Sequence, residues 1–249
     1  MIFDGKPSIV GHRGFGSGDR AGYRENTVAS FLAAVGCGLP WIELDVHRSR
    51  DGELMVWHDP VAPSGEVIVT RTAADLAAEG IATFTDVLAA LPAYVAVDVD
   101  VKTIIDDAVD RPPKRTHALV ADVLQQEHQK RRFLVSSFDP SAVVYLAGRR
   151  EAIGAVALGL IAGSGFPPRH AIPAAANLGL DVVCLHTDLL NVTPEHTIAI
   201  AHEAGLEVLA WSPGPADAVR LTAAGVDAVC VNDVPGVLAA LASVVGSRG

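Results

Sequence analysis

The chain contains few of the residues that mark secreted, membrane-spanning or disulfide-stabilised proteins. Among its 249 residues are only three cysteines, Cys37, Cys184 and Cys230, with no CxxC spacing and no even count. No apolar run approaches the roughly 18 residues of a membrane span, and the first residues lack the pattern of a signal peptide. We therefore expect reduced core thiols, no stable membrane insertion and a cytoplasmic location.

Basic residues are also scarce. Lys and Arg total 19 against 29 for Asp and Glu, which gives a net charge of -10. Such a field repels nucleic acid and anionic membranes at long range, so neither is an expected partner. An anionic small molecule would have to be bound by locally placed cations or by a metal ion.

The residues that are present indicate one α/β domain over residues 1–249. About half of them are apolar, enough for a sizeable core, and no linker or low-complexity tract divides the chain. Short β-branched runs alternate with Ala- and Leu-rich helical stretches, which predicts βα units around a parallel sheet and, at this length, a TIM (β/α)8 barrel. The predicted strands are 8–10, 41–46, 94–101, 132–137, 154–160, 181–185, 207–212 and 227–231.

Two further segments have distinct predictions. Residues 54–58 follow an Arg-Asp-Gly turn and are predicted to form an excursion after the second strand, with an irregular loop and one helical turn over about 60–83. The clearest predicted helices are 26–35, 115–129, 194–204 and 216–224, and a last one follows residue 233.

Chemically active side chains gather where the predicted strands end, which is where TIM barrels build their active sites. His12 and Arg13 follow the first strand, and His58 follows the excursion. The second strand carries Glu43 and Asp45, two residues apart and so on one face. The third carries Asp98, Asp100 and Lys102 in the same alternation, with valines on the other face.

Inward-facing carboxylates are costly unless they are paired or bind a cation. An all-oxygen ligand set suits a hard divalent ion, Ca²⁺ or Mg²⁺, better than zinc. Asp98 is predicted to lie deeper, as a hydrogen-bonded core residue. A network of ion pairs with Arg13 and Lys102 is the alternative explanation for the carboxylates.

Several motifs resemble those of the glycerophosphodiester phosphodiesterase family: GHRG at 11–14, ENT at 25–27, IELDVHRSRDGELMVWHD at 42–59, DVK at 100–102 and GVDAVCVNDVP at 225–235. The resemblance spans nearly the whole chain and implies a metal-dependent barrel enzyme that hydrolyses glycerophosphodiesters to an alcohol and glycerol 3-phosphate. It implies that His12 and His58 are the catalytic acid and base, in an order left open.

The same resemblance assigns the remaining site residues. It implies that Glu43, Asp45 and Asp100 bind the metal, although Asp100 stands where the family usually has the longer Glu. Arg13 and Lys102 match phosphate-contacting cations, and Glu25 supports them. His186 and Trp211 end the sixth and seventh predicted strands and are candidates for lining the substrate pocket. The other histidines, His47 and His117 among them, are expected to be solvated.

Three other functions remain open. A lysophospholipase D or sphingomyelinase D-like enzyme would need an apolar trough at the barrel mouth, and no apolar surface loop is evident there. A Schiff-base aldolase using Lys102 is disfavoured because flanking carboxylates would keep the lysine charged. A non-catalytic phosphate-binding barrel is weakened by the presence of both His12 and His58.

Overall fold

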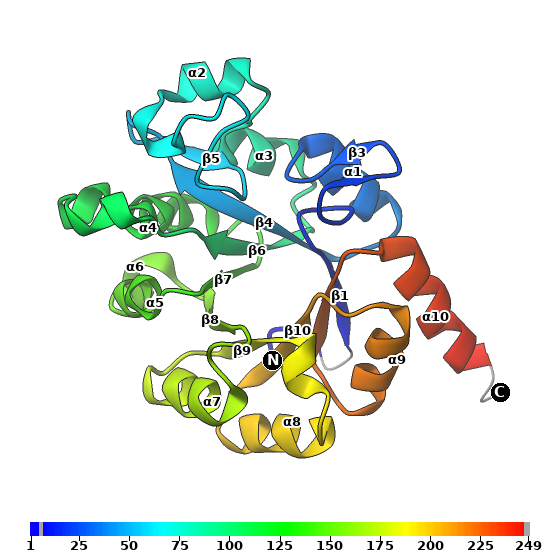
Figure 1. The fold of residues 1–249 in the computed structure, drawn as a ribbon. Coiled ribbons are helices and arrows are strands. Elements are labelled where there is room, and N and C mark those ends of the chain that lie inside the picture. Colours follow the sequence, from blue (N-terminus) through cyan, green and yellow to red (C-terminus); the bar gives the residue numbers. More distant parts are fainter. Residues whose placement is uncertain (5–6, 247–249) are drawn as a thin grey trace.

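The computed structural model describes residues 1–4 and 7–246, and it shows a closed barrel of eight parallel strands surrounded by helices (Figure 1). The barrel strands are β1 (Ser8–Gly11), β4 (Trp41–Arg48), β6 (Ala96–Val101), β7 (Phe133–Ser137), β8 (Ala157–Ala162), β9 (Val182–His186), β10 (Glu207–Trp211) and β11 (Ala228–Val231). Each strand pairs with the next, and β1 pairs with both β4 and β11, which closes the ring. The predicted TIM barrel is confirmed.

Helices follow the strands and cover the outside of the ring. They are α1 (Val28–Gly36), α2 (Ala73–Ala78), α3 (Phe84–Ala90), α4 (Thr116–Glu127), α5 (Pro140–Ala147), α6 (Arg150–Ile153), α7 (Pro168–Asn177), α8 (Pro194–Glu203), α9 (Pro215–Ala223) and α10 (Val234–Gly246). Four of them begin with proline, whose fixed φ suits the first helical position and whose missing N–H costs nothing there. These prolines are one local reason why the helices start where they do.

Strand alternation divides the core into two apolar layers. Val97, Val99 and Val101 of β6 face outward and are buried against the helices, as predicted. A second cluster fills the barrel interior, where Phe3 packs against Trp41 with ring centroids 5.3 Å apart. Among the described residues, no helix is both long enough and apolar enough to cross a membrane.

The excursion after β4 carries more structure than the sequence predicted. It forms β5 (Leu54–Val56), antiparallel to β4, then the 3-10 turn η1 (Ile68–Thr70) and α2. The excursion has a small hydrophobic core of its own, built on Met55, Ile68 and Leu76, which explains why it forms regular structure.

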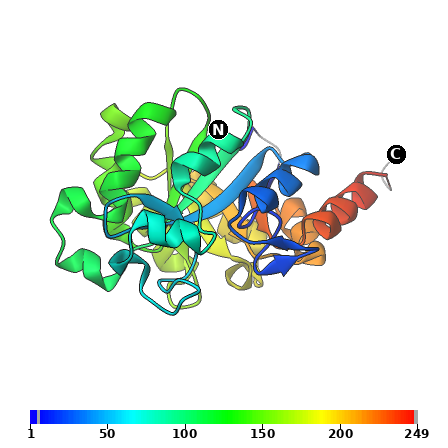
Figure 2. The ribbon, with the colours of Figure 1, turned by 90° about the horizontal axis from the view of Figure 1, so that it is seen from above.

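A hairpin of β2 (Asp19–Arg20) and β3 (Tyr23–Arg24) was not predicted. In Figure 2 the hairpin and the excursion both lie toward the lower end of the barrel.

Candidate active site

The turn after β1 places His12 and Arg13 at the carboxyl end of the barrel. A Cβ on Gly11 would lie 2.2 Å from the Gly14 carbonyl oxygen, and one on Gly14 would lie 2.5 Å from Ser30 Oγ, so both positions require glycine. Arg13 itself adopts a positive φ of 51°, which is uncommon for a residue with a side chain. The chain is thereby folded back tightly enough for the Arg13 N–H to donate to Glu43 Oε2 at 2.7 Å.

Each residue of the Glu-Asn-Thr segment after the hairpin has a distinct partner. Glu25 accepts from Arg13 Nη1 at 3.0 Å and orients its guanidinium. The Asn26 amide donates to Asp45 Oδ2 at 2.7 Å. Thr27 caps α1 by accepting from the Ser30 N–H at 3.2 Å. The segment therefore connects the start of a helix to a guanidinium and a carboxylate of the site.

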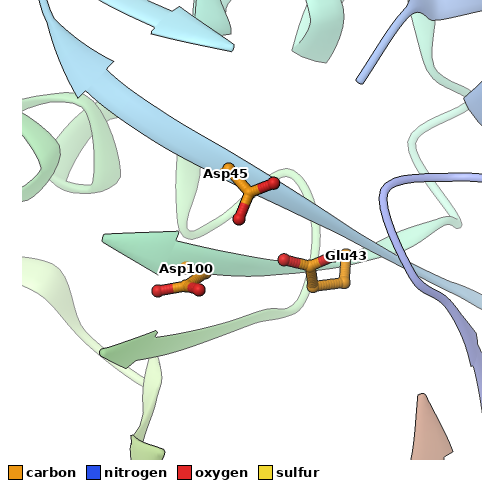
Figure 3. A group of neighbouring side chains, drawn as sticks. All are labelled: Glu43, Asp45 and Asp100. Carbon is orange, nitrogen blue, oxygen red and sulfur yellow. The ribbon is translucent and has the colours of Figure 1, made fainter. Parts of the chain in front are cut away.

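Four carboxylates share the barrel interior near its carboxyl end. Strand register sets Glu43 beside Asp98 and Asp45 beside Asp100, and all four are at least 95% buried. Figure 3 shows Glu43 and Asp45 on β4 and Asp100 on β6 with their carboxylates directed into one region. One oxygen from each of these three lies within 4.8 Å of the others. The predicted ligand set is thus brought together.

Two cations are held against this cluster. Lys102 Nζ lies 2.8 Å from Asp45 Oδ1 and 2.5 Å from Asp100 Oδ2, and Arg13 Nε lies 3.3 Å from Asp45 Oδ2. Burial would lower the pKa of Lys102, but Asp100 and Asp45 outweigh it and raise that pKa. The ammonium is therefore kept charged, which argues against a Schiff-base aldolase.

Burial and mutual repulsion raise the pKa of three of the four carboxylates. Burial, followed by repulsion from Asp45 and Asp100, raises the pKa of Glu43 well above its usual range. Burial raises the pKa of Asp98 to about 8 although Ser136 donates to it, and burial raises that of Asp100 to about 6. Burial would also raise the pKa of Asp45, but Lys102 and Arg13 hold it below the usual value.

A divalent cation fits this arrangement. Asp100 Oδ1 is buried and has no hydrogen-bond partner among the described residues. When Glu43, Asp45 and Asp100 are ionised, Arg13 and Lys102 leave one of their three negative charges unneutralised, and a bound cation would relieve the repulsion among them. The oxygen donors suit Ca²⁺ or Mg²⁺. Asp98 instead accepts from Ser136 Oγ at 2.8 Å, in agreement with its prediction as a hydrogen-bonded core residue.

His12 is held in one orientation by a residue far along the chain. Its Nδ1 lies 2.6 Å from Asn232 Oδ1, an oxygen that also accepts from the Ser17 N–H at 3.0 Å. Because that atom acts as an acceptor, Nδ1 carries the proton and Nε2 is left with a free lone pair. Burial, with a further contribution from Arg13, lowers the pKa of His12 to about 4, so the ring is neutral near pH 7.

His58 has a different environment. Its side chain is one-third exposed, and its Nδ1 lies 2.7 Å from Asp59 Oδ1. This carboxylate oxygen can accept a hydrogen bond from a protonated Nδ1. His47, expected to be solvated, is instead 2% exposed on β4, and its Nε2 donates to the His58 carbonyl oxygen at 3.0 Å. The expectation for His47 was wrong because β4 continues to Arg48, beneath the ordered excursion. His117 is likewise buried, on α4.

A cavity of about 130 Å³ opens above the carboxylates. Its polar wall comes from β1, β4, β6 and the turn after β5, and its apolar wall from β7 to β11. Trp211 belongs to the apolar wall, whereas Glu25 and His186 are not among the lining residues. His186 packs against the Trp211 ring at 4.3 Å between centroids and supports it. The lining residues are His12, Arg13, Glu43, His58, Asp98, Asp100, Lys102, Ser136, Phe138, Ile161, Cys184, Leu209, Trp211 and Cys230.

Sequence reasoning did not single out Asn26, Asn232 or Ser136, all of which hold a site residue in place. Asn26 lies inside the ENT motif, and Asn232 directly follows the last barrel strand, so their positions were the available signal. The criterion of a polar residue at a strand end, applied to the eighth strand, identifies Asn232, which directly follows β11. Ser136 lies inside β7, where its register beside Asp100 is visible only in the fold.

Comparison with known proteins places this geometry in a family. The sequence profile of the glycerophosphoryl diester phosphodiesterase family matches residues 12–235. The chain belongs to this family. Over 54 residues it is 43% identical to a glycerophosphodiester phosphodiesterase of Caldanaerobacter subterraneus subsp. tengcongensis, and over 62 residues 44% identical to a glycerophosphocholine phosphodiesterase of Candida albicans. These matches span 22% and 23% of this chain, but only 21% and 5% of the two relatives.

Solved structures of glycerophosphodiester phosphodiesterases share the fold along nearly the whole chain. A glycerophosphodiester phosphodiesterase from Parabacteroides distasonis superposes with a TM-score of 0.79 at 19% identity, covering 96% of this chain and 98% of its own. An Oleispira antarctica phosphodiesterase in complex with the product sn-glycerol-3-phosphate gives 0.78 at 22% identity, covering 97% and 99%. At these identities the likeness concerns the barrel.

Proposed function

We propose that this chain hydrolyses glycerophosphodiesters to an alcohol and glycerol 3-phosphate, with His12 and His58 as the proton-transferring pair and with a divalent metal ion bound by Glu43, Asp45 and Asp100. The observation that carries the proposal is the pair of histidines in one cavity with a cluster of buried carboxylates and two cations. Membership of the family and the product-bound Oleispira antarctica relative support it.

The hydrogen-bond partners of the two histidines support one order of base and acid. His12 accepts a proton at Nε2, because Asn232 keeps the proton on Nδ1 and burial keeps the ring neutral. His58 is the proton donor to the leaving alkoxide in this proposal, because it lines the cavity and Asp59 Oδ1, 2.7 Å from its Nδ1, orients the ring. Positioned acid and base groups of this kind contribute typically about 10²–10⁴-fold each to rate.

The cations and the metal site act on the phosphoryl oxygens. Arg13 lines the cavity with its guanidinium oriented by Glu25, and Lys102 lines it with its ammonium held between Asp45 and Asp100. Glu43, Asp45 and Asp100 would hold the metal ion, which would supply positive charge that offsets the negative charge developing on the phosphoryl oxygens. The chain's own negative field makes these local charges necessary for binding an anion.

The test is a product-release assay with the metal-loaded protein. Glycerophosphocholine, glycerophosphoethanolamine and p-nitrophenyl phosphate are compared with and without a chelator, and glycerol 3-phosphate and free phosphate are measured. We expect release of glycerol 3-phosphate from the diesters, abolished by chelation and restored by Ca²⁺ or Mg²⁺, and little free phosphate from p-nitrophenyl phosphate. Faster cleavage of the monoester would place the chain in another reaction class, and no release from any diester would favour a phosphate-binding barrel.

A further inference from the structure

A second cavity adjoins the proposed active site on its apolar side. It has a volume of about 500 Å³, within the range of roughly 300–1,000 Å³ that small-molecule sites occupy. It runs outward between the loop that joins β7 to α5 and the loop that joins β8 to α7, and we call it the lateral groove. Its lining consists of Phe138, Pro140, Leu160, Ile161, Gly163, Ser164, Gly165 and Phe166.

The lateral groove and the active-site cavity share part of their walls. Phe138 and Ile161 line both. The Phe138 ring is half exposed and meets Trp211 edge-on, with centroids 5.8 Å apart. Lys102 Nζ lies 5.9 Å from the centroid of the same ring. Phe138 therefore stands at the boundary between the charged site and the groove, and a ligand can contact both.

A short turn forms the outer wall of the groove and leaves its path open. The Phe166 N–H donates to the Gly163 carbonyl oxygen at 2.9 Å, and the Phe166 ring stacks on His170 at 6.3 Å. A Cβ on Gly163 would lie 3.8 Å from Phe138 Cε1, and one on Gly165 would meet nothing within 4 Å. Larger side chains can therefore be introduced at both glycines as obstructions.

The distribution of polar groups determines which part of a diester fits where. The two hydroxyls of a glycerol moiety need hydrogen-bonding partners, and the charged groups of the cavity come from β1, β4, β6 and the turn after β5. Among the described residues that line the lateral groove, none is charged and Ser164 alone has a polar side chain. A substituent that extends into the lateral groove would bind more tightly if it buried apolar surface there.

We propose that the lateral groove binds an apolar substituent of the alcohol that is esterified to glycerol 3-phosphate, so that the enzyme prefers diesters of hydrophobic alcohols. This rests on the proposed function and specifies its substrate class. No single apolar surface loop was evident in the sequence, because Phe138 and Phe166 come from separate loops and line one groove only in the fold.

The test measures kcat/KM for the methyl, butyl and octyl esters of sn-glycerol 3-phosphate. Each methylene that enters the groove should raise kcat/KM about two- to fourfold, and octyl should exceed methyl by roughly tenfold or more. In Gly163→Trp and Gly165→Trp the octyl-to-methyl ratio should fall toward unity, because the indole occupies the groove. Gly36→Trp is the matched control, since Gly36 is exposed at the end of α1 with open space around it, and it should keep the wild-type ratio.

Binding of non-hydrolysable phosphonate analogues of the methyl and octyl esters, measured by calorimetry, separates the two proposals. Tighter octyl binding that Gly163→Trp abolishes would support the groove even in a protein without turnover, whereas turnover with equal kcat/KM for all three esters would overturn the groove alone. A chain-length preference that both tryptophan variants retain, with folding verified by circular dichroism, would also overturn it. The apolar chain of 1-acyl-lysophosphatidylcholine is on the glycerol and not on the alcohol. An increase in kcat/KM that depends on the groove and occurs only with this lipid would also overturn the proposal.

Discussion

His12 and His58 line the same cavity but have opposite kinds of partner. An amide oxygen of Asn232 accepts from His12, whereas a carboxylate of Asp59 faces His58. A neutral amide fixes a tautomer without favouring a charged ring, and a carboxylate favours the charged ring. The proposed order of base and acid depends on Asn232, which lies 220 residues from His12 and therefore could not be paired with it from the sequence.

Replacement of either histidine should therefore remove a proton-transfer step and leave the fold intact. We expect His12→Ala and His58→Ala each to reduce kcat by roughly 10²-fold or more. Steady-state kinetics at saturating metal give kcat, and circular dichroism reports folding. His196→Ala, on the exposed surface of α8, is the matched control and should retain full turnover. Wild-type turnover in His12→Ala would remove that residue from the mechanism.

Asp100 divides its two oxygens between different tasks. Oδ2 accepts from Lys102, while Oδ1 is buried with no hydrogen-bond partner in the described part of the chain. If Oδ1 binds the metal, Asp100→Asn should weaken metal binding by removing a charge, and Asp100→Glu should preserve it. Titrating Ca²⁺ or Mg²⁺ against activity in the three proteins measures this. Equal half-saturation concentrations would show that Asp100 is no ligand.

At the scale of elements, the connection from β1 to α1 sets the geometry of half the site. Its turn positions His12 and Arg13, and the segment before α1 holds Arg13 through Glu25 and Asp45 through Asn26. Thr27 ends this segment by capping α1 and by donating to the Arg24 carbonyl oxygen at 2.7 Å. The helix start and the site are thus parts of one hydrogen-bonded unit.

Loss of the Thr27 hydroxyl should destabilise the protein modestly. Thr27→Ala removes the N-cap hydrogen bond, and we expect the free energy of unfolding to fall by about 1 kcal/mol. Thr193→Ala is the matched control, because Thr193 precedes α8 in a left-handed conformation and its side chain makes no capping hydrogen bond. Urea denaturation of the three proteins gives the comparison. An equal loss in both variants would show that the cap of α1 contributes nothing specific.

The elements that the sequence predicted well are those with strong local patterns. Alternation of valine with aspartate placed β6 and its inward carboxylates, and all eight barrel strands lie within a few residues of their predicted positions. The ends were less accurate where turns intervene: β8 was predicted at 154–160 but spans Ala157–Ala162, since Gly154 takes a positive φ of 66°. The β2–β3 hairpin is local: Ala21 and Gly22 form its two-residue turn with positive φ of 52° and 83°, a signal that the sequence interpretation missed. The burial of His47 depends instead on the excursion that folds over β4, which no local pattern encodes.

For the whole molecule, barrel closure is what completes the site. β11 pairs with β1, so that Asn232 meets His12, and β6 pairs with β4, so that Asp100 joins Glu43 and Asp45. Closure of the barrel also places the charged wall of the active-site cavity opposite its apolar wall. The whole chain carries a net charge of -10, so an anionic substrate must be attracted by the few cations of the site.

That overall charge should be visible in the kinetics. A diester with net negative charge is repelled at long range, and salt screens the repulsion because the Debye length falls from about 30 Å at 0.01 M to about 8 Å at 0.15 M ionic strength. We expect kcat/KM for glycerophosphoethanol, a monoanion, to rise up to a few-fold over this range at saturating metal. Glycerophosphocholine, which is zwitterionic with no net charge, is the matched control and should change less. Stopped-time assays with sodium chloride as the added salt measure both. A fall in kcat/KM for the monoanion alone would mean that Arg13, Lys102 and the metal dominate the field even at a distance, and that the charge of the whole chain does not govern substrate approach.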